Sequence, residues 1–295
     1  MRLRRVPRLQ ADHWPAVLAA FVVGQLRCCA LALLVMGCLA LSRVLPLHNW
    51  GIARYDAVLL GCLLAQWGLL RTGFETSREA AVVLAFHGLG FALEAFKVTQ
   101  GSWSYPEDAL SKLLDVPLYA GFMYASVGSY VAHAWRTFDL QLCGLPPLRV
   151  QLALAAGAYL NFFTHHYGPD LRLLLTAALA LSFRRAWVCL VVTGHTLRLP
   201  LNLSFALIGL FVFLAENAAT FLGAWVYPHQ RAGWQPVHPT KWLAWTLLVV
   251  VAFLVVSGLR RWEARRSGAR VSITAAGPCP PGPAVQGSAP AHPGH

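Results

Sequence analysis

The chain has 295 residues, of which 57% are hydrophobic and only 12% are charged. A soluble globular domain carries about 25% charged residues, so the composition excludes a soluble protein. The net charge of +12 does not indicate a nucleic-acid partner, because the basic residues lie between long apolar runs. Basic residues between apolar runs orient a protein in a lipid bilayer, so the expected partner is the bilayer.

Eight apolar segments are candidates for crossing the bilayer as helices, each crossing requiring about 20 residues. In chain order they are residues 28–45, 56–71, 80–97, 117–136, 150–167, 171–190, 200–222 and 239–260. The sixth is the weakest, because Arg184 and Arg185 interrupt it. The sequence therefore predicts an all-α, polytopic membrane bundle of about eight spans.

The two ends of the chain differ from this apolar region, residues 28–262. Residues 1–27 form a basic segment that resembles the start of a signal peptide, but Arg27 and the length of the run that follows favour an uncleaved anchor. Residues 263–295 are rich in Gly and Pro and are expected to be a disordered cytoplasmic tail. The seven cysteines show neither metal nor disulfide spacing, and we interpret them as small apolar residues.

The distribution of basic residues predicts the orientation. Of the 24 Lys and Arg residues, an eight-span arrangement places sixteen on the side of both termini and seven on the other, with Arg27 unassigned. Basic residues favour the cytoplasmic side, so both termini are expected there.

A repeated motif is the most informative feature of the sequence. Six residues recur at an offset of 122: Phe91, Glu94, Gly101, Trp103, Tyr105 and Pro106 match Phe213, Glu216, Gly223, Trp225, Tyr227 and Pro228. The offset shifts the chain by four spans, which predicts two parallel four-helix halves, about 28–138 and 150–260, related by a pseudo-twofold axis along the membrane normal. A motif that merely ends a helix at the interface is the alternative, but it leaves both glutamates unexplained.

The two repeated glutamates are expected at the same depth. Each follows the start of its span by 15 or 16 residues, which at 1.5 Å per residue places it roughly 22–24 Å across a core of about 30 Å. A carboxylate facing lipid there is costly, so each is expected to face the bundle interior, unless it snorkels to the outer interface.

Other polar residues are expected at a similar height. Lys97 lies one turn above Glu94 and is expected to neutralise it. Asn161 and His165 share a helix face. The candidate catalytic residues are Glu94, Glu216, His165, His166, Asp170 and Asn161. The candidate substrate-binding residues are His87, Lys97, Trp103, Tyr105, Trp225, Tyr227 and Asn217.

Several strings of residues carry a family resemblance. They include residues 93–97 (Leu-Glu-Ala-Phe-Lys), 101–107 (Gly-Ser-Trp-Ser-Tyr-Pro-Glu), 161–166 (Asn-Phe-Phe-Thr-His-His) and 215–225. On these strings the chain resembles the bacterial integral membrane family called domain of unknown function 817, over roughly residues 28–262. The resemblance implies a multi-span protein of the bacterial plasma membrane with no established activity. A weaker similarity of design connects the chain to carotenoid hydratases and heterodimeric-type lycopene cyclases.

Four functions fit these residues. The first is acid/base chemistry on an isoprenoid or other lipid, in a pocket near the outer leaflet walled by Trp and Tyr. The second is a metalloenzyme that uses the histidines and carboxylates as ligands, although the metal and any other cofactor stay unknown. The third is a proton- or cation-coupled transporter. The fourth is a scaffold without catalytic activity, so the sequence leaves open whether the protein is an enzyme.

Overall fold

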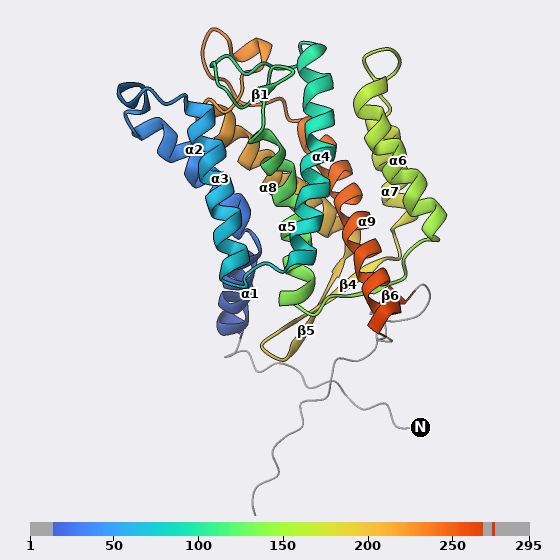
Figure 1. Ribbon diagram of the computed structural model, residues 1–295. Helices are drawn as coiled ribbons and strands as arrows, with labels where there is room; N and C mark the ends of the chain where they lie inside the picture. Colours follow the sequence, from blue (N-terminus) through green and yellow to red (C-terminus); the bar gives the residue numbers. More distant parts are fainter. Residues whose placement is uncertain (1–13, 268–272, 275–295) are drawn as a thin grey trace, which may run out of the picture.

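The computed structural model describes residues 14–267 and 273–274, and there the chain is mostly helical (Figure 1). The α-helices are α1 (Trp14–Cys28), α2 (Ala30–Val44), α3 (Arg54–Arg71), α4 (Ser77–Thr99), α5 (Ala120–Thr137), α6 (Leu148–Thr164), α7 (Arg172–Ser182), α8 (Leu201–Phe221) and α9 (Lys241–Ser267). Two short 3-10 helices, η2 (Leu47–Trp50) and η3 (Pro228–Gln230), lie in connections. Helix α1 begins and α9 ends at the same end of the bundle, the lower one in Figure 1.

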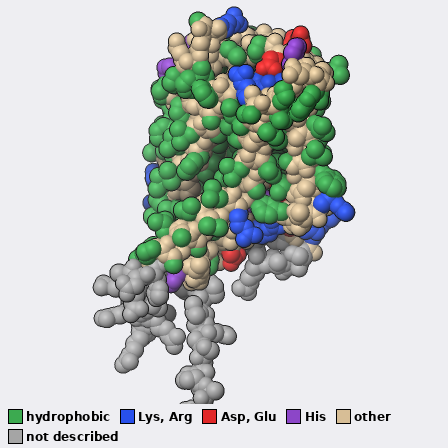
Figure 2. All heavy atoms as spheres, turned by 90° about the vertical axis from the view of Figure 1, so that its left-hand side faces the viewer, with side chains coloured by type: hydrophobic (Ala, Val, Ile, Leu, Met, Phe, Trp, Pro, Cys, Tyr) green, Lys and Arg blue, Asp and Glu red, His purple; other side chains and the backbone are tan. Residues whose placement is uncertain are grey.

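The outer surface of the bundle is apolar, as a bilayer requires. Large side chains such as Leu84 (73% exposed), Leu173 (73%) and Phe211 (70%) point away from the core. Figure 2 shows hydrophobic side chains over the middle of one face and charged ones mostly toward its two ends. Three of the described helices, α4, α8 and α9, are long and apolar enough to cross a membrane; α1 and α2 qualify as a fourth if taken together across their 63° bend. The protein thus has the character of a helical membrane protein.

The sixth expected span, 171–190, ends earlier than predicted. Helix α7 has only 11 residues, about 16 Å of helix, which is too short to cross the hydrocarbon core alone. Strand β4 (Trp187–Val192) follows and pairs with β5 (His195–Pro200) through a turn in which Thr193 and Gly194 have positive φ. The apolar run was misread because it leads into β4, whose Val188, Val191 and Val192 are β-branched residues that favour a strand.

Small sheets accompany the helices, which the all-α prediction did not include. One has the strand order β5-β4-β3-β6, with β3 (Gln141–Cys143) antiparallel to β4 and parallel to β6 (Ile273–Thr274). The other pairs β1 (Lys112–Leu113) with β2 (Val116–Pro117). Cys143 and Cys189 form a disulfide between β3 and β4. The interpretation of every cysteine as a small apolar residue was therefore wrong for these two, since strand pairing and not sequence spacing brings them together.

The predicted terminal segments are described only in part. Helix α1 covers the second half of the stretch 1–27, and α9 continues to Ser267, inside the expected tail 263–295. Residues 1–13, 268–272 and 275–295 lie outside the described residues.

Two helical hairpins, α4–α5 and α8–α9, pack closely and position the site. Helix α4 begins at a capping box, in which Thr76 and Glu79 satisfy each other's backbone N–H groups. The first helix of each hairpin, α4 or α8, ends before a glycine with positive φ, Gly101 (68°) or Gly223 (70°), which lies about two turns after its glutamate. Glycine tolerates this left-handed conformation, so the chain turns sharply there and brings the Trp and Tyr that follow back over the helix end.

Candidate functional site

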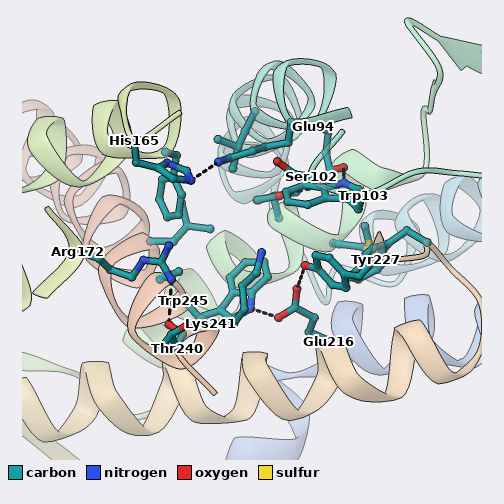
Figure 3. A pocket seen from close by; sticks show the side chains of 18 residues that line it. Glu94, Ser102, Trp103, His165, Arg172, Glu216, Tyr227, Thr240, Lys241 and Trp245 are labelled. Atoms are coloured by element: carbon teal, nitrogen blue, oxygen red, sulfur yellow. Dashed lines mark hydrogen bonds between the residues drawn. The ribbon is translucent and has the colours of Figure 1, made fainter. Parts of the chain in front are cut away.

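A cavity of about 240 Å³ lies between the ends of the two hairpins and the α6–α7 connection (Figure 3). Its walls combine charged, aromatic and aliphatic side chains. The lining residues are Leu93, Glu94, Lys97, Ser102, Trp103, Met123, Tyr124, Phe162, His165, Arg172, Glu216, Trp225, Tyr227, Thr240, Lys241, Ala244, Trp245 and Leu248. The repeated glutamates of α4 and α8 thus reach one cavity.

Glu94 is buried, with 3% of its surface exposed, and both of its oxygens accept hydrogen bonds. The Trp103 indole Nε1 (2.7 Å) and the Tyr105 hydroxyl (2.8 Å) donate to Oε2. The Tyr124 hydroxyl donates to Oε1 at 2.7 Å. Three donors therefore hold this carboxyl group inside the protein instead of in contact with lipid.

Glu216 is held in a similar way, with 4% exposed. The Tyr227 hydroxyl donates to Oε1 at 2.6 Å, and the Trp245 indole donates to Oε2 at 2.7 Å. Tyr105 and Tyr227 occupy equivalent positions in the sequence repeat, whereas the indole on Glu216 comes from α9 and not from the repeated Trp225.

These donors define where a proton can sit on each glutamate. An indole N–H only donates, whereas a tyrosine hydroxyl both donates and accepts. Oε2 of Glu216, whose donor is an indole, is therefore an acceptor in either protonation state. A proton on Glu216 is best placed on Oε1, facing Tyr227, whereas each oxygen of Glu94 faces a tyrosine hydroxyl, Oε1 that of Tyr124 and Oε2 that of Tyr105.

Lys97 does not neutralise Glu94, contrary to the prediction. Its ammonium lies 3.2 Å from Nε2 of His165 and 2.9 Å from Nε2 of His166. The Nδ1 atom of His165 is 2.7 Å from the Asn161 carbonyl oxygen, so Nδ1 carries the proton and Nε2 accepts from Lys97. Both histidines follow the end of α6. The helix-face prediction failed because Lys97 points toward the α6–α7 connection.

Asn161 and Asp170 shape that connection and do not line the cavity. The Asn161 amide donates to Asp170 Oδ1 at 3.1 Å, and its oxygen accepts from the Leu171 backbone N–H at 3.0 Å. Asp170 pairs with Arg172 at 2.9 Å. Arg172 does line the cavity, and it also donates to the Thr240 carbonyl oxygen at 3.3 Å.

Four more of the predicted binding and catalytic residues do not line the cavity. Tyr105 is buried behind Glu94, and His166 contacts Lys97 from outside. His87 packs edge-on against Phe122, two turns from Glu94. Asn217 accepts a hydrogen bond from the Val237 backbone N–H at 2.9 Å, which ties the loop before α9 to α8.

The sequence analysis missed Lys241, the first residue of α9. Its ammonium lies 4.9 Å from the ring centre of Trp103 and 4.7 Å from that of Tyr227. Figure 3 shows the side chain extending into the cavity, with Glu216 and Tyr227 to one side and Arg172 to the other. No repeat signal marks this position, since its counterpart 122 residues earlier is Tyr119.

No group of three or more His, Cys, Asp or Glu side chains in the described part of the chain is placed to hold a metal ion. His165 and His166 instead share an ammonium partner.

Comparison with known proteins identifies the family. Residues 17–253 match the family described as "Protein of unknown function (DUF817)". A relative from Bacillus subtilis (strain 168), "Uncharacterized protein YoaT", is 46% identical over 233 residues, which cover 79% of this chain and 88% of that protein.

Two solved structures of a mycobacterial Insig homolog, MvINS, are similar at 18% identity. For the structure of a cross-linked trimer, the TM-score is 0.46, and the match covers 65% of this chain and 97% of the other. For the structure of the homolog from Mycobacterium vanbaalenii, the TM-score is 0.45, and the match covers 62% of this chain and 93% of the other. The similarity to carotenoid-modifying proteins stays a prediction. The match over residues 17–253 confirms the expected family, and the chain belongs to DUF817.

Proposed function

We propose that this protein acts on an isoprenoid or another lipid by acid/base chemistry in the cavity lined by Glu94 and Glu216. One observation carries the proposal: two buried carboxyl groups, from α4 and α8, reach the same aromatic-walled cavity. Ionisable groups buried inside a membrane protein are costly and usually functional.

The hydrogen bonds suggest how the proton moves. Oε1 of each glutamate faces a tyrosine hydroxyl, Tyr124 or Tyr227, so that oxygen exchanges the reacting proton while the indole holds the other in place. The faces of Trp103 and Tyr227 already lie within 5 Å of one ammonium, that of Lys241. Such faces stabilise a cation by about 2 kcal/mol when water is excluded, which suits a cationic intermediate of a polyene.

The cavity volume limits the part of the substrate that is enclosed. At about 240 Å³, it is smaller than the range of about 300–1,000 Å³ that is common for ligand pockets. We therefore propose that only the head group or a terminal ring enters, near the outer leaflet, while the remaining hydrocarbon stays in the bilayer.

The test compares membrane lipid extracts from cells that produce the wild-type protein, Glu94→Gln or Glu216→Gln. A glutamine preserves the shape and one acceptor oxygen but cannot exchange a proton. We expect a lipid species that depends on the wild-type protein to disappear in both variants. Asp108→Asn, which changes an exposed carboxylate outside the cavity, is the matched control. An unchanged lipid profile in both glutamate variants contradicts the proposal.

We also infer that the chain crosses the plasma membrane eight times, as two related halves with both termini in the cytoplasm, and that residues flanking the short helix α7 complete the sixth crossing. The equivalent contacts of Tyr105 with Glu94 and of Tyr227 with Glu216 support the two halves. The Cys143–Cys189 disulfide joins β3 to β4, and β3 also pairs with β6, which follows α9. The disulfide therefore lies at the end of the bundle that this orientation places in the cytoplasm. Because disulfides are rare in the cytoplasm, the orientation needs a direct test. An impermeant maleimide applied to intact cells should label Asp108→Cys and leave Arg266→Cys unlabelled; the reverse pattern overturns the orientation.

A further inference from the structure

Lys241 has an environment that the proposed acid/base chemistry does not explain. Its side chain lines the cavity, and its ammonium lies over the faces of Trp103 and Tyr227. Among residues 14–267, no hydrogen-bond acceptor and no carboxylate ion pair is found for this ammonium. An ammonium has three N–H donors, and donors removed from bulk water need acceptors. The cavity is the place from which an acceptor can come.

The carboxylates in the cavity wall are engaged elsewhere. Both oxygens of Glu94 and both of Glu216 accept from indole or phenol groups. Among the described residues, neither glutamate therefore forms a direct ion pair with Lys241 or with another cation.

The other two cations of the cavity already have partners. Lys97 is bonded to His165 and His166, and Arg172 to Asp170 and the Thr240 carbonyl. Their positive charges still face the same space as Lys241, because all three residues line it from different helices, α4, α7 and α9. Lys241 thus differs from the other two cations in having no acceptor among the described residues, and the other two add to the positive potential around it.

Apolar surface continues away from this charged region. Leu93, Tyr124 and Leu248 line both the cavity and a smaller crevice, whose other walls are mostly aliphatic and aromatic. At about 10 Å³ the crevice is too small to enclose a hydrocarbon chain, so a ligand that places a charged group at Lys241 would leave its chain along the apolar surface of the bundle, in the bilayer.

We propose that the cavity binds the anionic head group of an amphipathic lipid, a carboxylate or a phosphate, and that Lys241 contacts it directly. The inference rests on the proposed lipid function and names the chemistry by which the lipid is recognised. A charge-assisted hydrogen bond between an ammonium and such an oxygen is stronger than one between neutral groups.

Native mass spectrometry of the full-length protein in detergent tests this with three probes that share one chain: dodecyl phosphate, dodecanoate and dodecanol. We expect the two anions to bind the wild-type protein at least about tenfold more tightly than dodecanol. Lys241→Met should abolish that preference, whereas Lys241→Arg should retain it. Arg231→Gln, which removes one exposed charge outside the cavity, should leave it unchanged. Inorganic phosphate in competition separates a free anion from a lipid head group: displacement of dodecyl phosphate at equal concentration contradicts a lipid ligand.

The outcomes separate the two proposals. If dodecanol binds as tightly as the anions, or if Lys241→Met keeps the preference while remaining folded by its melting temperature, the anionic head group is wrong and lipid binding survives. If none of the three probes binds the wild-type protein, both this inference and the lipid function fail. The Lys241→Arg variant guards against misfolding, since it retains the charge while changing the side chain.

Discussion

Ser104 and Val226 pair with each other through two backbone hydrogen bonds, of 3.0 and 2.9 Å. They are the central residues of the two copies of the Gly-x-Trp-x-Tyr-Pro motif, 122 positions apart. A residue that pairs in antiparallel fashion with its own counterpart lies beside the axis that would relate the two copies. The bridge therefore joins the two segments that carry Tyr105 and Tyr227 to their glutamates.

This pairing predicts a cross-link. Residues that exchange two backbone hydrogen bonds in an antiparallel pair have Cα atoms about 5.5 Å apart, within the range for a disulfide. The double variant Ser104→Cys/Val226→Cys should form an intramolecular disulfide under mild oxidation, detected as a linked peptide by mass spectrometry. Neither single variant should yield that peptide. Failure of the double variant to cross-link contradicts the arrangement of the two motifs.

The donors to Glu216 predict an effect on stability. Trp245→Phe removes the indole that donates to Oε2 and leaves that oxygen without its partner. A buried polar group without a partner costs about 1–3 kcal/mol, so the melting temperature should fall. Trp262→Phe, at an indole 45% exposed at the far end of the same helix, is the control and should change it little. Equal effects of the two substitutions would show that the Glu216 contact is unimportant.

The two glutamates could be identified from the sequence because burying a carboxyl group in an apolar segment costs free energy, so its repetition indicates a function. It could not identify Trp245 or Lys241, since their role depends on how α9 packs against α8 and on where a loop ends. It placed Lys97 near Glu94 from helix periodicity, which fixes the face of a side chain but not which neighbouring helix it contacts. Strand β4 was missed because a short apolar run does not by itself distinguish a strand from part of a helix.

Glu75, which the sequence analysis did not single out, predicts a pH dependence. It lies just before α4, is 2% exposed, and accepts hydrogen bonds from Gln66 and from Ser129 (2.6 Å), with His133 Nε2 3.5 Å away. Burial alone would raise the pKa of Glu75, but the nearby His133 imidazole and the hydrogen bonds from Ser129 and Gln66 outweigh it and hold that pKa below its usual value.

A carboxyl group with a lowered pKa in the folded state stabilises the protein at pH values above its unfolded pKa, about 4.3. That contribution is lost as the pH falls through the lower, folded value. Glu75→Gln should therefore lower the melting temperature at pH 7 and reduce its further fall toward pH 4, measured by thermal unfolding in detergent. Asp108→Asn should behave as the wild type. A Glu75→Gln curve parallel to that of the wild type would mean that this carboxyl group is not linked to stability.

Two glycines of α4 provide a matched test of how Tyr124 reaches Glu94. A Cβ on Gly90 would clash with the Tyr124 ring, whereas one on Gly88 would meet no atom within 4 Å. Gly88→Ala should stabilise the helix by about 0.5–1 kcal/mol, because alanine loses less backbone entropy. Gly90→Ala should destabilise the protein by about 1–3 kcal/mol through overpacking. By displacing the Tyr124 hydroxyl from Oε1, it should also impair any activity that depends on Glu94. The comparison of melting temperatures and lipid profiles decides: if Gly90→Ala matches Gly88→Ala in both, Tyr124 is not held against Glu94 by the packing of α4 on α5.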